Sequence, residues 1–449
     1  MEMTRREFVA SAAAAGAGLV FTQLVGAADG AAAAEVNVGL IGAGAQGRVL
    51  LTDCLKIPGV KFRAVCDIWP YHSGYAARLL GKYGHKAVEY EDYRELLEKE
   101  KALDAVIVAT PDWLHAEHTL AALAAGKHVY CEKEMSNTIE DARKMVQAAK
   151  ASGKLLQIGH QRRSNPRYLA ALDFIEKKKA LGRMTNVTGQ WNRAKLLNVG
   201  WPKTMELPAG KLKQYGYDTM DRFRNWRWYK KFSGGPIADL GGHQIDVFNW
   251  FLHTGPRAVI ASGGLDYHEG VEWYDTVQAM YEWEYDWESQ KRIVRGFYQT
   301  LTTTSHGGYV ETIMGGDGSM IISEDAGVGG MRRETAAEMA KWEEELQKLM
   351  DKAAEVKETT TAPGEEKDEP KIGHSIPSPG RYYPPIVAPG QAKPVHLPHL
   401  ENFFDAIRKG TPLNCPPECA FATAVGVLKV NEAVETGKRI ELKAEDYKA

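Results

Sequence analysis

A glycine-rich pattern near the start of the chain is the first feature whose residue types and spacing could do chemistry. Gly-x-Gly-x-x-Gly occupies residues 42–47, directly after an apolar run over 36–41, and Asp67 ends the next apolar run. Such glycines allow a tight turn beside a pyrophosphate, and the carboxylate accepts from ribose hydroxyls and repels a 2′-phosphate. The pattern therefore predicts a site for NAD rather than NADP. The residues expected to contact the dinucleotide here are Gly42, Gly44, Ala45, Gln46, Gly47 and Asp67.

A second set of residues is spaced as one helical stripe in the second half of the chain. If the stretch is helical, the residues at i, i+4, i+7 and i+11 share a face; they are Asp239, His243, Asp246 and Trp250. Two carboxylates, an imidazole and an indole on one face would line a polar sugar pocket. The alternative is a capped helix, with Asp239 as N-cap, His243 as a satisfied polar group and Asp246 in solvent. Spacing alone leaves both interpretations open.

Polar residues also stand where predicted strands end. Thr110, Pro111 and His115 follow one apolar run, and Glu132 and Lys133 follow another. Ligands of open α/β sheets bind at the carboxyl ends of the strands, so these residues are expected to face the cofactor. A lysine in such a place, taken alone, would be interpreted as a solvated loop charge.

Two further groups are candidates for ligand contacts. Arg162, Arg163 and Tyr168 follow another predicted strand end; the first is expected to contact the cofactor and the other two the substrate. The segment 221–229 mixes aromatic residues, Trp226 among them, with arginines. That mixture suits a carbohydrate platform, and it suits an interdomain or subunit contact equally well.

The elements that must position these residues alternate in type in the first half of the chain. Strands alternating with helices predict a parallel, doubly wound Rossmann sheet. The predicted strands are 36–41, 60–66, 105–109, 128–131 and 155–158, with helices such as 93–100 and 115–125 between them. Beyond about residue 160, runs rich in β-branched and aromatic residues predict a large open, mostly antiparallel sheet in a C-terminal α+β domain. These runs are 185–191, 277–285 and 293–303.

This pattern divides the chain into an NAD-binding domain over 35–160 and a substrate and oligomerisation domain over 161–445. The second domain contains an insertion over 327–398, where one apolar helical stripe is followed by a proline-rich arm. We expect this insertion to act between subunits or over the pocket, and a surface loop that binds nothing is the alternative. A last helical region is predicted over 399–434.

The first residues are expected to be a targeting segment rather than part of the fold. Arg5 and Arg6 precede a weakly apolar run over 10–25, and small residues near 27 offer a cleavage site. Residues 1–27 are therefore interpreted as a twin-arginine signal peptide, which exports folded proteins to the periplasm. The run is too short and too rich in alanine to span a membrane.

Composition excludes some kinds of partner. The formal net charge of the 449 residues is -2 and there is no long basic block, so nucleic acid is not an expected partner. One histidine with two aspartates could bind a metal, but no second histidine cluster is evident. We therefore predict no metal site.

Four segments together resemble the Gfo/Idh/MocA family of oxidoreductases, the family of glucose–fructose oxidoreductase and inositol dehydrogenase. They are 38–47, 109–115, 126–133 and 159–163, and 399–413 is similar to the closing helix of the family. The resemblance covers nearly all of 35–445 apart from about 327–394. It implies an N-terminal Rossmann domain and a C-terminal sheet often used for oligomerisation, hence a dimer or tetramer. The family usually has Glu-Lys-Pro here, and in this chain Glu134 stands in place of the proline that would follow Glu132 and Lys133.

The resemblance also implies roles for three residues. His243 would be the general base, Asp239 would orient the imidazole or share its proton, and Lys133 would stabilise developing charge on the substrate oxygen. All three would contact the substrate, with Asp246 as a hydrogen-bond anchor. This predicts an exported, NAD-dependent oxidoreductase that acts on a secondary alcohol of a sugar, polyol or glycoside and keeps its cofactor bound.

Two rival functions remain open. One is an NAD-dependent glycoside hydrolase or lyase that works through transient oxidation to a keto-sugar. The other is a non-catalytic sugar-binding protein, against which the joint presence of Lys133, Asp239 and His243 argues.

Overall fold

A computed structural model describes most of the chain. The described residues are 19–20, 33–194, 199–345, 348, 380–383, 386–387 and 393–449. The chain forms two compact units. The larger holds 27–165, 189–309 and 393–449, and the smaller holds 1–26, 166–188 and 310–392. Most of the predicted signal peptide and of the proline-rich arm lies outside the described residues.

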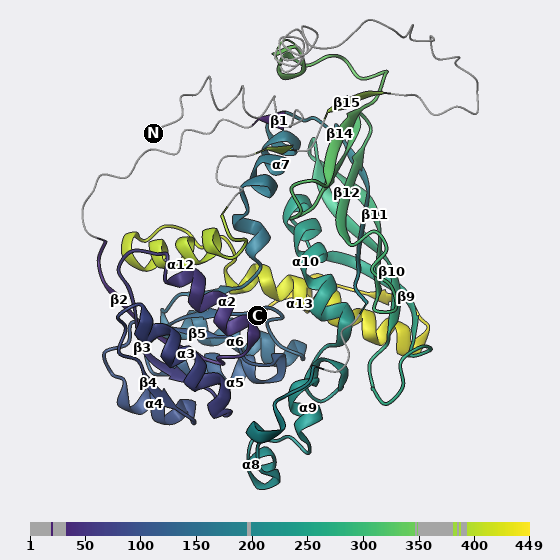
Figure 1. The fold of residues 1–449 in the computed structure, drawn as a ribbon. Helices are drawn as coiled ribbons and strands as arrows, with labels where there is room; N and C mark the ends of the chain where they lie inside the picture. The colour runs from purple at the N-terminus through teal and green to yellow at the C-terminus, as the bar shows by residue number, and fades with distance from the viewer. Residues whose placement is uncertain are drawn as a thin grey trace, which may run out of the picture. The chain divides into compact units, whose positions relative to one another are not determined.

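The first part of the larger unit is a six-stranded parallel sheet, as predicted (Figure 1). Its order is β4-β3-β2-β5-β6-β7. The strands are β2 (Val36–Ile41), β3 (Val60–Cys66), β4 (Val88–Tyr90), β5 (Ala105–Val108), β6 (His128–Cys131) and β7 (Leu156–Ile158). Only β4 was not predicted, because it is a short edge strand with two exposed residues and no apolar run.

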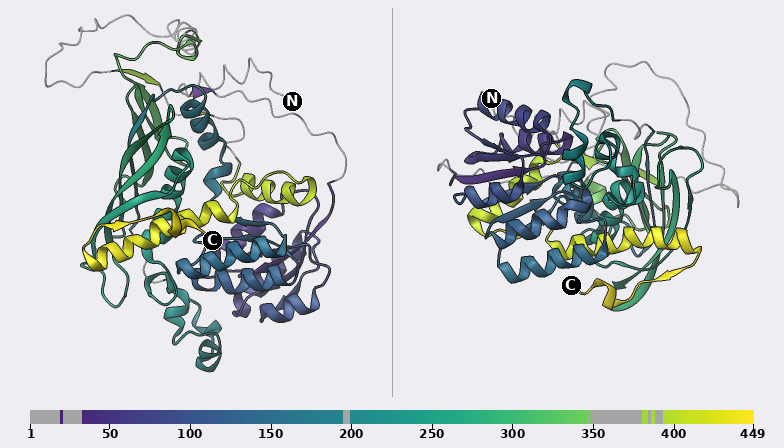
Figure 2. Two further views of the ribbon diagram at one scale, coloured as in Figure 1. Left: turned by 180° about the vertical axis from the view of Figure 1, so that it is seen from behind. Right: turned by 90° about the horizontal axis from the view of Figure 1, so that it is seen from below.

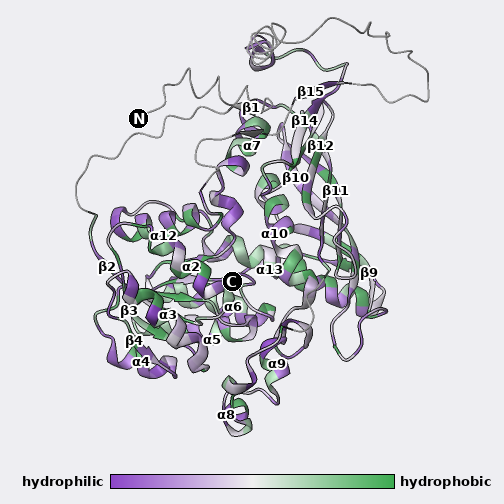
Figure 3. Ribbon diagram, in the orientation of Figure 1, coloured by the Kyte–Doolittle hydropathy of each residue, from purple (hydrophilic) through white to green (hydrophobic). Residues whose placement is uncertain are grey.

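Helices cover both faces of this sheet (Figures 1 and 2). One face packs against α2 (Ala45–Cys54), α3 (Pro70–Lys82) and α12 (Leu397–Lys409). The other packs against α4 (Tyr93–Lys99), α5 (Asp112–Ala124), α6 (Ile139–Ser152) and α13 (Pro417–Thr436). A strand buried on both sides, such as β5, is a continuous apolar run, and Figure 3 shows the strands of this sheet as mostly hydrophobic.

The register of this sheet brings four strand ends to one edge. Ile41 pairs with Cys66 on one side and with Val108 on the other, and Val108 pairs with Cys131. The residues that follow these positions therefore gather at the carboxyl edge, where the strand order reverses between β2 and β5.

The rest of the larger unit centres on α10 (Gly235–Leu252). Every residue of this helix except Trp250 is buried. An antiparallel run of strands in the order β11-β10-β9-β17 belongs to the same unit. These strands are β9 (Pro256–Gly264), β10 (Thr276–Trp287), β11 (Gln290–Leu301) and β17 (Ile440–Glu441). Short elements complete the unit: η1 (Gln161–Ser164), η2 (Lys203–Met205), α8 (Ala209–Gln214), α9 (Met220–Arg224), η3 (Trp226–Trp228) and η4 (Ala444–Tyr447).

The smaller unit contains α7 (Pro166–Glu176) and a second antiparallel run of strands. Its members are β12 (Tyr309–Gly315), β13 (Gly318–Ile322), β14 (Gly329–Arg333) and β15 (Arg381–Tyr383), and a short parallel pair joins β1 (Leu19–Val20) to β16 (Ile386–Val387). β8 (Met184–Asn192) begins in this unit and ends in the larger one. The mostly antiparallel character predicted for the second half of the chain is confirmed.

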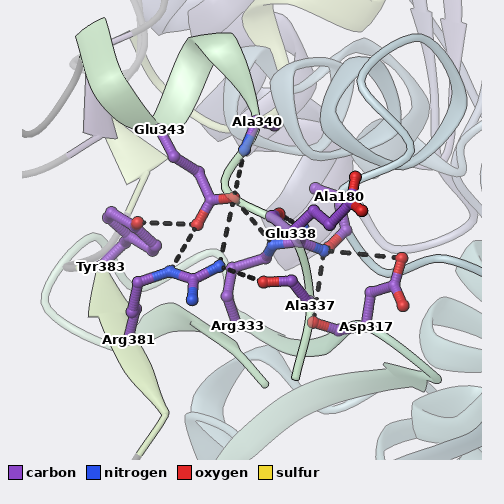
Figure 4. A network of polar contacts seen from close by, with 9 residues as sticks. All are labelled: Ala180, Asp317, Arg333, Ala337, Glu338, Ala340, Glu343, Arg381 and Tyr383. Atoms are coloured by element: carbon purple, nitrogen blue, oxygen red, sulfur yellow. Dashed lines mark hydrogen bonds and ion pairs between the residues drawn. The ribbon is translucent and has the colours of Figure 1, made fainter. Parts of the chain in front are cut away.

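A buried carboxylate holds β14 and β15 in the smaller unit (Figure 4). Glu343 pairs with Arg333 Nε at 3.2 Å and with Arg381 Nε at 3.0 Å, and Tyr383 donates its hydroxyl to it at 2.8 Å. Burial opposes the charged form of Glu343, yet these donors and the Ala340 N–H keep its pKa below its usual value. One side chain thus joins β14 to β15 within the predicted insertion, 327–398.

No helix in the described part of the chain is long and apolar enough to cross a membrane.

Candidate functional site

The glycine turn after β2 has the shape that a pyrophosphate needs. Gly42 has a φ of +93°, and a Cβ there would lie 2.6 Å from the carbonyl oxygen of Ala109. A Cβ on Gly47 would lie 1.9 Å from the carbonyl oxygen of Gly42, so no side chain fits at either position. Gly44 precedes α2 without a side-chain cap, and a Cβ there would meet only the His72 ring, at 3.8 Å. The helix N-terminus is therefore open to a phosphate, as predicted.

Asp67 lies at the end of β3 and binds the glycine turn itself. Its Oδ2 accepts from the N–H of Ala43 at 2.8 Å and its Oδ1 from the N–H of Trp69 at 2.9 Å. The ring Nδ1 of His72 lies 3.3 Å from Oδ2. The carboxylate thus fixes the turn, and its preference for NAD over NADP stays a prediction.

His115 joins the loops that follow β5 and β6. Its Nδ1 lies 2.6 Å from the carbonyl oxygen of Glu134 and its Nε2 lies 2.7 Å from that of Thr110. Burial lowers the pKa of His115 to about 4, against the effect of these two carbonyls. The neutral ring donates to one of them, so His115 has a positioning role behind the predicted cofactor site. Pro111 is the N-cap residue of α5.

Glu132 and Lys133 follow β6 at the same edge of the sheet. Glu132 is buried, and burial raises the pKa of its carboxyl although His396 and Lys133 oppose this. Its Oε1 has no hydrogen-bond partner among the described residues. Gln46, which opens the first turn of α2, lies 3.3 Å from the ring of His396 through its Nε2.

Lys133 and Asp239 form a buried ion pair across the two halves of the larger unit. The Nζ of Lys133 donates to Asp239 Oδ1 at 3.1 Å and also to the Asp239 carbonyl oxygen. Arg227 donates its Nε to Asp239 Oδ2 at 3.1 Å. Burial opposes both charges, but Lys133 and Arg227 hold the pKa of Asp239 well below its usual range, and Asp239 raises that of Lys133. The strand-end lysine is therefore an ammonium.

His243 lies one helical turn after Asp239 and stacks on Trp191. The two ring centroids are 5.1 Å apart. The Nδ1 of His243 is buried without a hydrogen-bond partner among the described residues. Burial, with Lys133 and Arg162 nearby, holds the pKa of His243 well below its usual range. The imidazole is neutral at physiological pH and has a nitrogen free to accept a proton.

Asp246 anchors α10 rather than facing solvent. It accepts a forked pair from Arg163, with Nε at 2.8 Å from Oδ2 and Nη2 at 2.9 Å from Oδ1, and Thr423 of α13 donates to it at 3.0 Å. The helix begins at Gly235, so Asp239 is not its N-cap. The capped-helix alternative is therefore wrong, and Arg163 is engaged with Asp246 in a structural contact.

The remaining predicted residues do not all lie beside Asp239 and His243. Arg162 is buried with its guanidinium carbon 5.5 Å from the centre of the Trp191 ring, beside the His243 stack. Trp226 stacks on Arg227, whose guanidinium carbon is 4.2 Å from its ring. Tyr168 belongs to the smaller unit, where it donates its hydroxyl to Glu311 at 2.7 Å. A substrate role for Tyr168 stays a prediction.

The structure adds site residues that no motif marks. Asp112 opens α5 and receives the Ser233 hydroxyl at 3.3 Å; burial and the nearby Asp239 raise its pKa to about 7. Trp191 and Arg227 come from a strand end and a short turn, where no periodic spacing points to them. Glu134 is also buried at the site. Its only signal in the sequence is the missing proline after Lys133.

Two family models match the chain, and between them they contain most residues of this site. The first, described as an oxidoreductase family with an NAD-binding Rossmann fold, matches residues 36–160. The second is the GFO/IDH/MocA C-terminal domain and matches residues 171–290. The chain belongs to the Gfo/Idh/MocA family. Its first domain is accordingly an NAD-binding domain, and the glycine turn, the open helix end and Asp67 described above fit that cofactor.

Relatives within the family act on small polyols or sugars, as their names state. Inositol 2-dehydrogenase of Salmonella paratyphi B is 29% identical over 225 residues, 50% of this chain and 55% of the relative. A 1,5-anhydro-D-fructose reductase of Ensifer adhaerens is 32% identical over 226 residues, 49% of this chain and 56% of the relative. The matched part thus spans little more than half the length of these relatives. A solved levoglucosan dehydrogenase, in complex with NADH and levoglucosan, shares the fold with a TM-score of 0.65 at 19% identity, over 91% of this chain and 99% of that one.

Proposed function

We propose that the protein is an NAD-dependent oxidoreductase that interconverts a secondary alcohol and a ketone on a sugar, polyol or glycoside. The observation that carries this proposal is that the Lys133 ammonium, at the carboxyl edge of the NAD-binding sheet, binds Asp239 one helical turn before the neutral His243 of α10. Bound NAD supplies the hydride acceptor or donor. His243 takes the hydroxyl proton, Lys133 stabilises the charge that develops on the oxygen, and Asp239 holds Lys133 in place.

Two buried ion pairs at the site favour a neutral substrate. The positive charges of Lys133 and Arg163 are matched by the carboxylates of Asp239 and Asp246. Because these pairs are already satisfied and buried, a substrate carboxylate or phosphate would find no free buried cation among them. A neutral polyol needs only hydrogen bonds, which agrees with the substrates in the names of the relatives.

We also propose that the enzyme acts in the periplasm and keeps NAD bound through turnover. The support for export is the twin-arginine segment, and no nicotinamide pool is expected outside the cytoplasm. The segment 199–232 supports tight binding, because it packs on the loops that follow β3, β4 and β5. Trp69 Nε1 donates to the Met205 carbonyl oxygen at 2.6 Å, Tyr215 donates to Glu91 at 2.7 Å, and Trp113 Nε1 donates to the Tyr217 hydroxyl at 3.2 Å.

A homo-oligomer, dimer or tetramer, is part of the same proposal. Ile260, Met280 and Phe297 face one another across β9, β10 and β11, and all three are exposed. Such an apolar row on the outer face of a sheet is typical of a surface that meets a second copy.

One assay tests the activity. Purified protein is denatured and its supernatant assayed for NAD and NADP, and intact protein is mixed with myo-inositol, levoglucosan, 1,5-anhydro-D-fructose and a set of glycosides. We expect NAD without NADP, and a change in bound-cofactor absorbance with at least one neutral polyol. Absence of dinucleotide, or no response to any of these compounds, would refute the proposal.

The same panel tests the second candidate, a glycosidase that works by transient oxidation. The observation in its favour is the extra buried acid, Glu134, because cleavage of a glycosidic bond needs a proton donor for the leaving group. That reaction releases a free sugar with no lasting change in bound NAD, whereas a dehydrogenase leaves reduced cofactor and a ketone.

A further inference from the structure

Glu134 places a carboxyl group directly against the helix that carries the proposed base. Its side chain is 1% exposed. A Cβ on Gly242 would lie 1.7 Å from Glu134 Oε1, so the carboxyl occupies the space that any side chain at 242 would need. Gly242 stands between Asp239 and His243 on α10. The Glu134 carboxyl therefore lies beside the stripe formed by these two residues and Asp246.

Neither oxygen of this carboxyl has a hydrogen-bond partner among the described residues. A buried carboxylate without partners is strongly disfavoured, because desolvation is not repaid by hydrogen bonds. By contrast, the Asp246 carboxylate on that stripe accepts hydrogen bonds from Arg163 and Thr423. The open hydrogen-bonding capacity of Glu134 points to a partner that is not part of the chain.

The groups that face Glu134 come from three elements. Lys133 precedes it, Asp112 comes from α5, and Asp239 and Asp246 come from α10. Burial raises the pKa of Glu134 to about 8; Lys133 opposes this effect and the three aspartates add to it. The group is therefore mainly a neutral acid at physiological pH, with one O–H to donate and one C=O to accept.

We propose that Glu134 is a substrate-binding acid, which donates its O–H to a polyol oxygen next to the hydroxyl that Lys133 and His243 serve. This inference rests on the proposed function and deepens it. A neutral acid pairs with a hydroxyl or ether oxygen without adding charge to the site, which is what a neutral polyol requires. The proline that is usual in the family has no such donor. In this chain Glu134 would therefore add one hydrogen bond to the substrate that a proline could not make.

A ligand-free experiment tests the protonation state. Infrared spectra of wild type, Glu134→Gln and Asp112→Asn are compared at about pH 6 and about pH 9.5, on either side of the value of about 8. Because Asp112, with a pKa of about 7, is also protonated at the lower pH, we expect a protonated-carboxyl band in wild type that loses one component in Glu134→Gln, and this component should persist in Asp112→Asn. The latter is the matched control, because Asp112 is a second buried acid but already receives the Ser233 hydroxyl. A band that is equally strong in wild type and Glu134→Gln would overturn the proposal.

A second experiment tests contact with the substrate. The probe is the neutral polyol from the panel above that wild type oxidises, and its KM and the infrared band are followed against pH. In wild type the band should shift on binding, and KM should rise about tenfold as Glu134 ionises, the loss expected when one buried hydrogen bond is broken. Glu134→Gln, which keeps an N–H donor, should show a flat profile, and Glu134→Pro should have the raised KM at every pH.

The outcomes separate this inference from the proposed function. The role of Glu134 is overturned if its infrared band does not shift on substrate binding, or if the pH profile of KM in Glu134→Gln matches that of wild type. The oxidoreductase activity would stand in either case. If no polyol is oxidised at all, the proposed function fails and the role of Glu134 fails with it.

Discussion

His243, the proposed base, is neutral, and Lys133, the proposed stabiliser of charge, is positively charged. The imidazole is neutral because burial and nearby cations disfavour its protonated form, whereas the lysine stays charged because Asp239 contacts it at two oxygens. A base and an electrostatic stabiliser need these respective states at the same pH. The ion pair thus also serves His243, since a charged Lys133 helps to keep the ring unprotonated.

His243→Asn is expected to abolish turnover while fold and bound NAD persist. A positioned base contributes about 10²- to 10⁴-fold to the rate, and asparagine preserves polarity without basicity. The measurement is kcat on the polyol identified in the panel, with released NAD as the check on folding. Near-full activity of the variant would mean that the ring is only a packing element against Trp191.

The sequence predicts those site residues that stand at strand ends or at helical spacing. Strand ends bring Lys133 to the carboxyl edge, and the helical repeat puts Asp239 and His243 on one face of α10. Arg227 and Asp112 were not predictable in these roles. Arg227 reaches Asp239 from a short 3₁₀ turn, and Asp112 binds Ser233 from the start of a helix. The positions of both elements depend on tertiary packing. The partner of Asp246 was missed for the same reason, since Arg163 is distant from it in sequence.

At the scale of the element, α10 has two adjacent glycines in its interior that cost helix stability. The Tyr298 ring occupies the space beside Gly241, where a Cβ would lie 3.0 Å from it. The Glu134 carboxyl occupies the space beside Gly242. Glycine is about 1 kcal/mol less favourable than alanine in a helix interior. The helix accepts this penalty where neighbouring side chains need the space.

Gly242→Ala should therefore destabilise the protein rather than stabilise it. The new methyl group would displace the Glu134 carboxyl, and KM for the polyol should rise. Gly81→Ala in α3 is the control, because a Cβ there meets nothing within 4 Å and the helix preference should add about 0.5–1 kcal/mol. Urea unfolding of both variants, and of Gly242→Ala combined with Glu134→Ala, measures the effect. The double variant should recover stability; if it does not, Glu134 is not the group displaced.

Asp246→Asn should weaken the attachment of α10 to η1 and α13. It leaves the Arg163 guanidinium buried without its carboxylate, a change that costs about 3–5 kcal/mol. The pKa of Asp246 is lowered in the folded protein, because Arg163 outweighs burial, so this stabilisation is present above the ordinary aspartate pKa and is lost as the pH falls through the folded value. The difference between wild type and variant in urea unfolding should accordingly shrink in acid.

The control for that prediction is Asp286→Asn. Asp286 pairs with Lys291 at 3.0 Å, but both side chains are mostly exposed, so its loss should cost less than about 1 kcal/mol. Equal costs for the two substitutions would mean that the buried pair does not anchor the helix.

For the whole molecule, the sequence predicts the doubly wound sheet almost strand for strand, because strands buried on both faces are continuous apolar runs bounded by glycine or acidic residues. β10 and β11 are likewise long and aromatic. β13 and β14 were not predicted, since each has only five residues and begins with glycine, and β12 was not predicted because its seven residues include polar ones and no continuous apolar run. Their pairing depends on contacts with other strands, which no local pattern in the sequence reveals.

Met280→Glu should reduce the size of the assembly. The charge would stand at the middle of the exposed row between Ile260 and Phe297, where a second copy would have to bury it. Light scattering measures the mass, and Met205→Glu, an exposed methionine in the segment 199–232, serves as control. An unchanged mass for Met280→Glu, equal to that of the control, would place the contact elsewhere on the molecule.

The attachment of β14 and β15 to Glu343 has a consequence for engineering. Since one carboxylate binds Arg333 before residues 346–379 and Arg381 after them, the sheet does not depend on the length of chain between. Each doubling of such a loop costs only about 0.6 kcal/mol of closure entropy. A reporter domain inserted in this stretch should leave the catalytic half untouched, and a protease cut there should yield two fragments that stay together until acid protonates Glu343. The Glu343 cluster thus provides a point in the smaller unit at which sequence can be added between Arg333 and Arg381.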